Sequence, residues 1–110
     1  MNQSQLVGGV LDLAVVAALA TEESHGYELV RRLRDADFPP ISDASVYGTL
    51  KRLEEWRLLH ARLVESPDGR ARRSYTVTEE GRAWLRNSVE GWRQLTTSIQ
   101  RLLGEEAPVA

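Results

Sequence analysis

The sequence predicts a mainly α-helical fold with one small β-hairpin, and three observations lead to this fold class. Apolar residues recur at helical spacing in three segments that precede residue 57. Two short segments, 59–64 and 72–77, then alternate at the period of a β-strand and flank a turn sequence. The last segment, 78–103, returns to helical spacing. The 110 residues fit one compact domain with a long appendage.

The first predicted helix, Leu6 to Ala20, is apolar almost all round; the exceptions are Gly8, Gly9 and Asp12. A helix that is apolar on every side needs cover on every side, which one chain of this length can hardly supply. Its longest apolar run, 10–20, has only 11 residues and contains Asp12, and no basic segment precedes it. We therefore expect neither a membrane span nor a signal peptide, but packing against a second copy of the chain.

The second and third predicted helices are bounded by capping residues and by prolines. Ser24 is the expected N-cap of a helix over 27–36, which ends before a Pro-Pro pair because proline disfavours helical backbone in the residue before it. Ser42 or Asp43 is the expected N-cap of the third helix, which should run to about Trp56.

The turn Ser66-Pro67-Asp68-Gly69 joins the two predicted strands into a hairpin, since proline fixes one φ and glycine accepts a positive one. Thr78 then caps the last helix, which is expected to end near Leu103. Three helices, a hairpin and a further helix form the element order of a winged helix-turn-helix with a C-terminal extension. We assign 1–77 to that DNA-binding domain and 78–110 to a C-terminal dimerisation helix with a short tail.

The last helix carries apolar residues at heptad spacing. Its 26 residues would span roughly 39 Å at 1.5 Å per residue, which is longer than the small domain it follows. One chain cannot cover such a stripe, so we expect the helix to pair with its counterpart in a homodimer. The predicted dimer interface consists of Leu11, Leu85, Val89, Trp92, Leu95, Ile99 and Leu102.

The third helix has the features of a DNA-recognition helix. Its face with Val46, Leu50 and Leu53 should dock on the preceding helices, whereas Ala44 and Gly48 on the opposite face would let the backbone approach the floor of the major groove. Hydroxyl and cationic side chains around that face offer contacts to phosphates and base edges. The predicted DNA contacts from this helix are Ser42, Ser45, Tyr47, Thr49, Lys51 and Arg52.

Charge is distributed unevenly along the chain. The net charge of −2 argues at first sight against DNA as a partner, but 31–73 holds ten basic and seven acidic residues, whereas 1–30 holds no Lys or Arg and four acids. A local basic patch matters more for DNA than the total charge does. At the hairpin tip, Arg70, Arg72 and Arg73 lie within four residues beside a glycine turn, as expected of a wing that contacts phosphates or the minor groove.

Other function classes have little support in the sequence. The absence of cysteine excludes disulfides, a zinc finger and a thiol nucleophile. His25 and His60 have no further ligand at metal-binding spacing, so we expect no metal, no cofactor and no catalysis. We expect a cytoplasmic protein that binds duplex DNA. The alternative is a winged-helix module that binds a polypeptide, with the wing cations meeting an acidic partner; binding to duplex DNA and its salt dependence separate the two.

Three blocks of the sequence resemble the PadR-type transcriptional regulators: His25–Leu29 (HGYEL), Ser42–Glu54 (SDASVYGTLKRLE) and Gly69–Gly81 (GRARRSYTVTEEG). The resemblance covers about 6–103. It implies a homodimeric winged-helix repressor in which Tyr47 and its neighbours read a palindromic operator and the wing arginines hold the backbone. It also implies that the last helix dimerises with the first helix of the partner.

The sequence departs from this family at three positions. Gly48 stands where proline is frequent, and Ala44 stands where glycine is frequent; both are small, so close approach to DNA remains possible. Arg57 stands where a glycine usually closes the recognition helix. A side chain disfavours the left-handed conformation, so we expect the helix to run on for a turn or to end differently.

Trp92 is the predicted centre of an effector site. Its indole occupies a core heptad position between the small residues Ser88 and Thr96, which leaves a slot for a flat aromatic or cationic ligand. Some PadR relatives bind planar drugs between paired tryptophans on this helix, and Glu90-Gly91-Trp92 is similar to that stretch. The alternative is that Trp92 packs on the partner's first helix.

Overall fold

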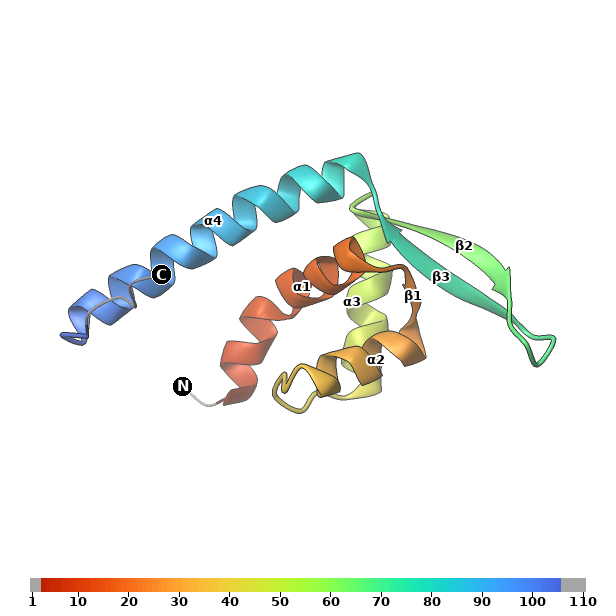
Figure 1. Cartoon of the computed structure of the whole chain (residues 1–110), viewed down its shortest axis with the longest axis horizontal. Helices are drawn as coiled ribbons and strands as arrows, with labels where there is room; N and C mark the ends of the chain where they lie inside the picture. Colours follow the sequence, from red (N-terminus) through yellow and green to blue (C-terminus); the bar gives the residue numbers. More distant parts are fainter. Residues whose placement is uncertain (1–2, 106–110) are drawn as a thin grey trace.

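The computed structural model describes residues 3–105 and confirms the predicted fold class (Figure 1). Three helices pack with the short strands of one antiparallel sheet, and a long final helix extends from this domain; the principal extents are 55 × 28 × 25 Å. In chain order the elements are α1 (Gln3–Thr21), β1 (Ser24–His25), α2 (Gly26–Asp35), α3 (Asp43–Glu55), β2 (Leu59–Glu65), β3 (Ala71–Val77) and α4 (Glu79–Leu102).

The hydrophobic core lies where α1, α2 and α3 meet the base of the sheet. The predicted inner face of α3 is confirmed, since Val46, Leu50 and Leu53 are fully buried. They join Val16 of α1 and Leu29 of α2, which are equally buried, in one apolar cluster. This packing presents the opposite face of α3 to solvent.

The sheet contains one strand that local sequence reasoning assigned otherwise. Ser24 is not the N-cap of α2 but part of β1, where it pairs with Tyr75 of β3. The cap is His25, whose Nδ1 accepts a hydrogen bond from the backbone N–H of Glu28 at 3.2 Å. Buried Ser24 instead accepts a 2.6 Å hydrogen bond from the Arg32 guanidinium, which also caps the carbonyls at the end of α1.

The wing is the hairpin of β2 and β3, in which Leu59 pairs with Val77 and Glu65 pairs with Ala71. The predicted turn is confirmed: Gly69 adopts a φ of 82°, and its N–H donates to the Ser66 carbonyl at 2.9 Å. β3 is the central strand, so β2 is an exposed edge of the sheet.

The end of α3 corrects the expectation for Arg57. The helix does not run on; it ends at Glu55, and Arg57 itself adopts the left-handed conformation, with a φ of 61°. The N–H of Leu58 then donates to the Leu53 carbonyl at 3.0 Å, which closes the helix as a glycine would.

Thr78 joins the end of α3 to the start of α4. Its hydroxyl donates to the Arg57 carbonyl at 2.7 Å and accepts from the Gly81 N–H at 2.9 Å, which confirms the predicted N-cap. Its own N–H donates to the Leu58 carbonyl at 3.1 Å. A Cβ at Gly81 would overlap that same Leu58 carbonyl, so the backbones approach to a distance that only glycine allows.

The apolar stripe of α4 is covered by its own chain only near the start of the helix. Leu85 packs against the core, whereas the stripe beyond it is exposed, from Trp92 at 47% to Leu102 at 87%. The predicted dimer interface needs one correction, which concerns Leu11. Only 6% of this residue is exposed, because it belongs to the core of its own chain. No helix within residues 3–105 is long and apolar enough to cross a membrane.

The close approach at Gly81 predicts a stability effect. Gly81→Ala should lower the free energy of unfolding by about 1–3 kcal/mol or more, because the methyl group collides with backbone that cannot move aside. Gly91→Ala, on the same helix with open space around the new methyl group, is the matched control and should raise stability by up to about 1 kcal/mol. Denaturant unfolding measures both; equal effects of the two substitutions would contradict the steric argument.

Candidate nucleic-acid interface

The N-terminus of α3 is held by two hydroxyl side chains that both remain exposed. The Ser42 Oγ accepts a hydrogen bond from the Ser45 N–H at 3.1 Å, as the predicted N-cap requires. The two side-chain oxygens also lie 2.9 Å apart and share a hydrogen bond. This end of α3 therefore presents hydroxyls beside backbone N–H groups, an arrangement that suits an anion such as a phosphate.

Tyr47 is held on the outer face of α3 by a glycine of another helix. Its side chain is 47% exposed, and its ring packs so closely on Gly26 at the start of α2 that any Cβ there would overlap it. In the sequence, Gly26 stands out only as part of the HGYEL block, and the steric contact with Tyr47 shows its role. Gly26 therefore leaves the space that the Tyr47 ring occupies.

The remaining predicted contacts on α3 separate into different environments. Lys51 is exposed and makes no ion pair with any described residue. Thr49 is only 3% exposed, so it cannot reach a base and is removed from the predicted set. Arg52 forms an ion pair with Asp12 of α1 and lies over the Trp56 ring at 5.4 Å, which ties it to internal partners.

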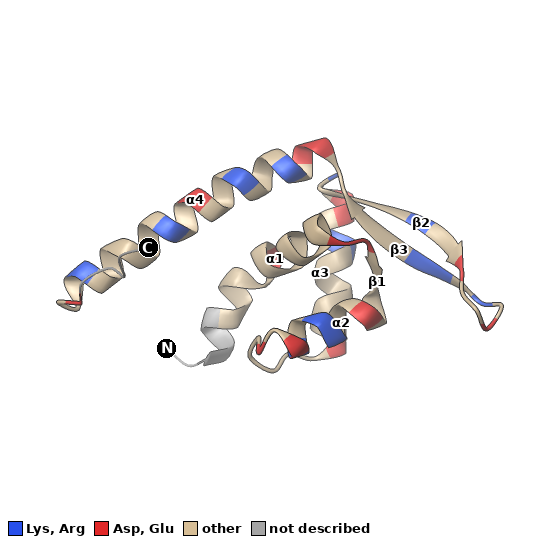
Figure 2. Ribbon diagram, in the orientation of Figure 1, with Lys and Arg blue, Asp and Glu red and all other residues tan. Residues whose placement is uncertain are grey.

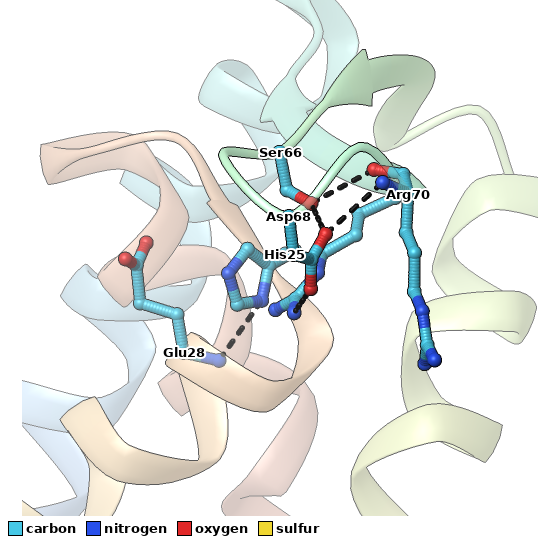
Figure 3. Close-up of polar contacts among 6 residues, drawn as sticks. His25, Glu28, Ser66, Asp68 and Arg70 are labelled. Carbon is cyan, nitrogen blue, oxygen red and sulfur yellow. Dashed lines mark hydrogen bonds and ion pairs between the residues drawn. The ribbon is translucent and has the colours of Figure 1, made fainter.

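The wing tip is a hydrogen-bonded turn that leaves one arginine free of any ion pair within residues 3–105 (Figure 3). Asp68 accepts hydrogen bonds from the Ser66 hydroxyl and the Arg70 N–H, which lower the pKa of its carboxyl group. The same carboxylate pairs with Arg72 at 3.3 Å. Arg70 is the free arginine: it uses its backbone in the turn, while its side chain points away from it.

Arg73 is paired with a residue that sequence reasoning did not consider. Its Nη2 donates to both carboxylate oxygens of Glu54, at 2.7 Å each, and this hydrogen bond raises the pKa of the guanidinium. Glu54 lies in the last turn of α3, 19 residues before Arg73. No local pattern signals this contact, because it depends on how the wing folds back on α3.

A second long-range pair fixes the opposite side of the sheet. Arg62 of β2 donates two 2.8 Å hydrogen bonds to Glu23, which lies between α1 and β1. The bonds from Arg62 and a further one from Ser74 lower the pKa of Glu23 to about 2. Figure 2 shows acidic and basic residues close together along the wing, so the basic middle of the chain is partly neutralised from within.

The wing and the starts of α2 and α3 enclose one cleft of about 570 Å³. It brings together the predicted contacts Tyr47, Arg70, Arg72 and Arg73, whereas Ser42, Ser45 and Lys51 do not line it. Residues outside the predicted set also line the cleft, His25 and Tyr27 among them.

A second pocket, of about 530 Å³, is apolar and lies between α1 and α4. Trp92 and Val89 form its α4 side, and Val10, Leu13 and Ala17 are among the residues on its α1 side. Residues 3–105 contain no group of three His, Cys, Asp or Glu side chains that could hold a metal ion.

The model of the transcriptional regulator PadR-like family matches residues 15–87, a span that includes α2, α3 and the wing. The chain belongs to the PadR-like family of transcriptional regulators. The match covers the cleft residues and the first part of α4, so the winged-helix geometry described above is that of a PadR-like protein.

Solved PadR-like structures are similar along nearly the whole chain. The PadR-like transcriptional regulator from Bacillus cereus has a TM-score of 0.83 and 30% identity, covering 93% of this chain and 99% of that one. A PadR family regulator from Eggerthella lenta has a TM-score of 0.82 and 31% identity, covering 91% and 87%. The transcriptional regulator YqjI of Escherichia coli is 32% identical over 85 residues, 74% of this chain but 39% of its own length.

Proposed function

We propose that this PadR-like protein is a homodimeric repressor that binds a palindromic operator in duplex DNA. The observation that carries the proposal is the single cleft in which Tyr47 of α3 and Arg70 of the wing face solvent together. An exposed tyrosine and a guanidinium without an ion pair in the described chain, both lining one cleft, suit base and phosphate contacts, respectively. The regulatory role of the family supports the same function.

In the proposed complex, the N-terminal half of α3 enters the major groove and the wing tip follows the adjacent backbone. Ser42 and Ser45 lie at the helix N-terminus, where hydroxyls and N–H groups bind phosphates. Open space around Gly48 lets the helix approach the groove. Lys51 and Arg70 then supply the cationic contacts, since Arg52, Arg72 and Arg73 already have carboxylate partners.

The proposed dimer uses the exposed part of the α4 stripe. Trp92, Leu95, Ile99 and Leu102 form a continuous apolar face that the described chain does not cover. Removing such a face from water is favourable, and a second copy offers a matching one. The two-fold axis of this dimer would place the two recognition helices on half-sites about one helical turn, roughly 34 Å, apart.

The apolar pocket between α1 and α4 is the proposed effector site. The exposed Trp92 ring offers a stacking surface to a planar aromatic or cationic ligand, and the opposing α1 wall is apolar. A ligand there releases DNA only if it binds one spacing of the recognition helices more tightly than another. The partner's first helix is the competing occupant of the same surface.

Substitutions in the cleft test the DNA contacts separately. Tyr47→Ala should cost about 1–3 kcal/mol of discrimination between operator and unrelated duplex, because it removes a base contact. Arg70→Ala should weaken binding to all duplexes and reduce the salt slope by about 1, because it removes one cation from the phosphate backbone. Fluorescence anisotropy at several salt concentrations measures both.

The matched control for the charge change is Arg101→Ala, in the last turn of α4 and far along the chain from the wing. It should leave the salt slope unchanged. A change of sequence preference with an unchanged slope in Arg70→Ala would reverse the assigned roles. Failure of the wild-type protein to bind any duplex at low salt would favour the polypeptide-binding alternative.

Leu95→Glu tests the dimer. A carboxylate buried without a partner costs several kcal/mol, so this variant should sediment as a monomer or fail to fold. Gln94→Glu adds the same charge on the polar side of α4 and should remain dimeric. Sedimentation equilibrium at micromolar concentration measures the difference, and a stable wild-type monomer there would refute the proposed assembly.

Trp92 fluorescence tests the effector site against a panel of planar aromatic cations. Binding should quench wild-type emission, and Trp92→Phe should abolish most of the quenching. Each ring contact should contribute roughly 0.5–1.5 kcal/mol to the free energy of binding. Trp56→Phe, which removes an exposed indole elsewhere, should retain it. Quenching that persists unchanged in Trp92→Phe would exclude this pocket as the binding site.

A further inference from the structure

The wing carries less available charge than its sequence indicates. Of its three closely spaced arginines, Arg72 pairs with Asp68 through one contact at 3.3 Å, and Arg73 pairs with Glu54 through two contacts at 2.7 Å. Arg70 alone among the three has no ion pair within residues 3–105. The Arg73–Glu54 pair is the tighter of the two and joins the wing to the recognition helix.

Glu54 is in an unusual place for a carboxylate. It lies in the last turn of α3, where the unpaired backbone carbonyls already carry partial negative charge and disfavour an acid. It is also only partly exposed, beside the wall of the DNA-facing cleft that Arg73 lines. A carboxylate in this position is unfavourable both for the isolated helix and for an approaching phosphate, unless a cation compensates its charge.

The pair changes what Arg73 contributes to DNA binding. A guanidinium that neutralises a phosphate releases a condensed counterion, and each such contact adds about 0.9 to the salt slope. A guanidinium already neutralised by Glu54 adds no net positive charge, and the carboxylate would itself face the phosphate. Arg73 therefore contributes little to the salt slope while it is paired with the Glu54 carboxylate.

We propose that Glu54 withholds Arg73 from the phosphate backbone and thereby sets the sequence-independent part of the affinity for DNA. This inference rests on the proposed DNA-binding function and assigns Glu54 as a positioning residue within it. Because Arg73 lines the cleft, the same pair also joins one wall of the cleft to the helix that carries Tyr47.

Glu54→Gln tests the inference on a random-sequence duplex, with the full chain and with anisotropy measured from 50 to 200 mM salt. The amide keeps the size of the side chain but releases Arg73. We expect tighter binding than wild type at low salt and a slope steeper by about 0.9 for each arginine released, which corresponds to a further three- to fourfold decrease in affinity across this salt range.

A double-mutant cycle separates the release of Arg73 from a general change of charge. Glu54→Gln combined with Arg73→Ala should return the slope to that of wild type, because both members of a neutral pair are gone. Glu54→Gln combined with Arg70→Ala should have a slope steeper than that of Arg70→Ala alone by the same full increase, because Arg70 is not part of the pair. Thermal melting checks that each variant is folded under the binding conditions.

The outcomes distinguish this inference from the function on which it rests. If wild type binds the duplex and Arg70→Ala lowers the salt slope, but Glu54→Gln has the same affinity and salt slope as wild type, the proposal for Glu54 is overturned. DNA binding then still stands. An increase that persists unchanged in the Arg73→Ala background also overturns it, since the effect would then be one of net charge. If wild type binds no duplex, both the proposed function and this inference fail.

Discussion

The hydrogen bonds that converge on Thr78 determine how the long helix is attached to the winged domain. Thr78 joins three parts of the chain: the end of α3 through the Arg57 and Leu58 carbonyls, the end of β3 that it follows, and the first turn of α4 through Gly81. The contact at Gly81 leaves no room for a side chain. The direction of α4 is consequently fixed relative to the end of α3 where the two elements meet.

Ion pairs between distant segments decide which cations remain available to a partner. Asp12, Glu23 and Glu54 each reach an arginine on another element, and the pairs hold α1 to α3, the α1–β1 connection to β2, and α3 to β3. These partly exposed pairs contribute modestly to stability. They also leave fewer of the arginines without a carboxylate partner than the sequence alone indicates.

Much of the fold could be predicted because its signals are local. The N-caps at Ser42 and Thr78, the turn that ends in Gly69 and the inner face of α3 all follow from residues within a few positions of one another. The N-cap prediction for Ser24 is wrong because its strand partner, Tyr75, lies about 50 residues later in the chain. Ser24 is a residue type that favours N-caps, but here it forms a strand pair that no local sequence pattern reveals.

The candidate site was predictable in its position but not in its electrostatics. Helical spacing and a basic hairpin indicated Tyr47 and the wing, whereas the burial of Thr49 and the pairing of Arg73 depend on how the elements pack. Arg57 shows the same limit for backbone conformation. Its neighbours enforce a left-handed φ that its own side chain disfavours, because closure of α3 and the start of β2 require it.

The most direct test of the account is selection of sequences bound by the full-length protein from a pool of random duplexes. A dimer that presents two copies of α3 predicts enrichment of a palindromic site, with half-sites about one helical turn apart. Enrichment of a single asymmetric half-site would contradict the symmetric dimer. Recovery of the pool without any enriched sequence would contradict the central claim that this surface reads DNA.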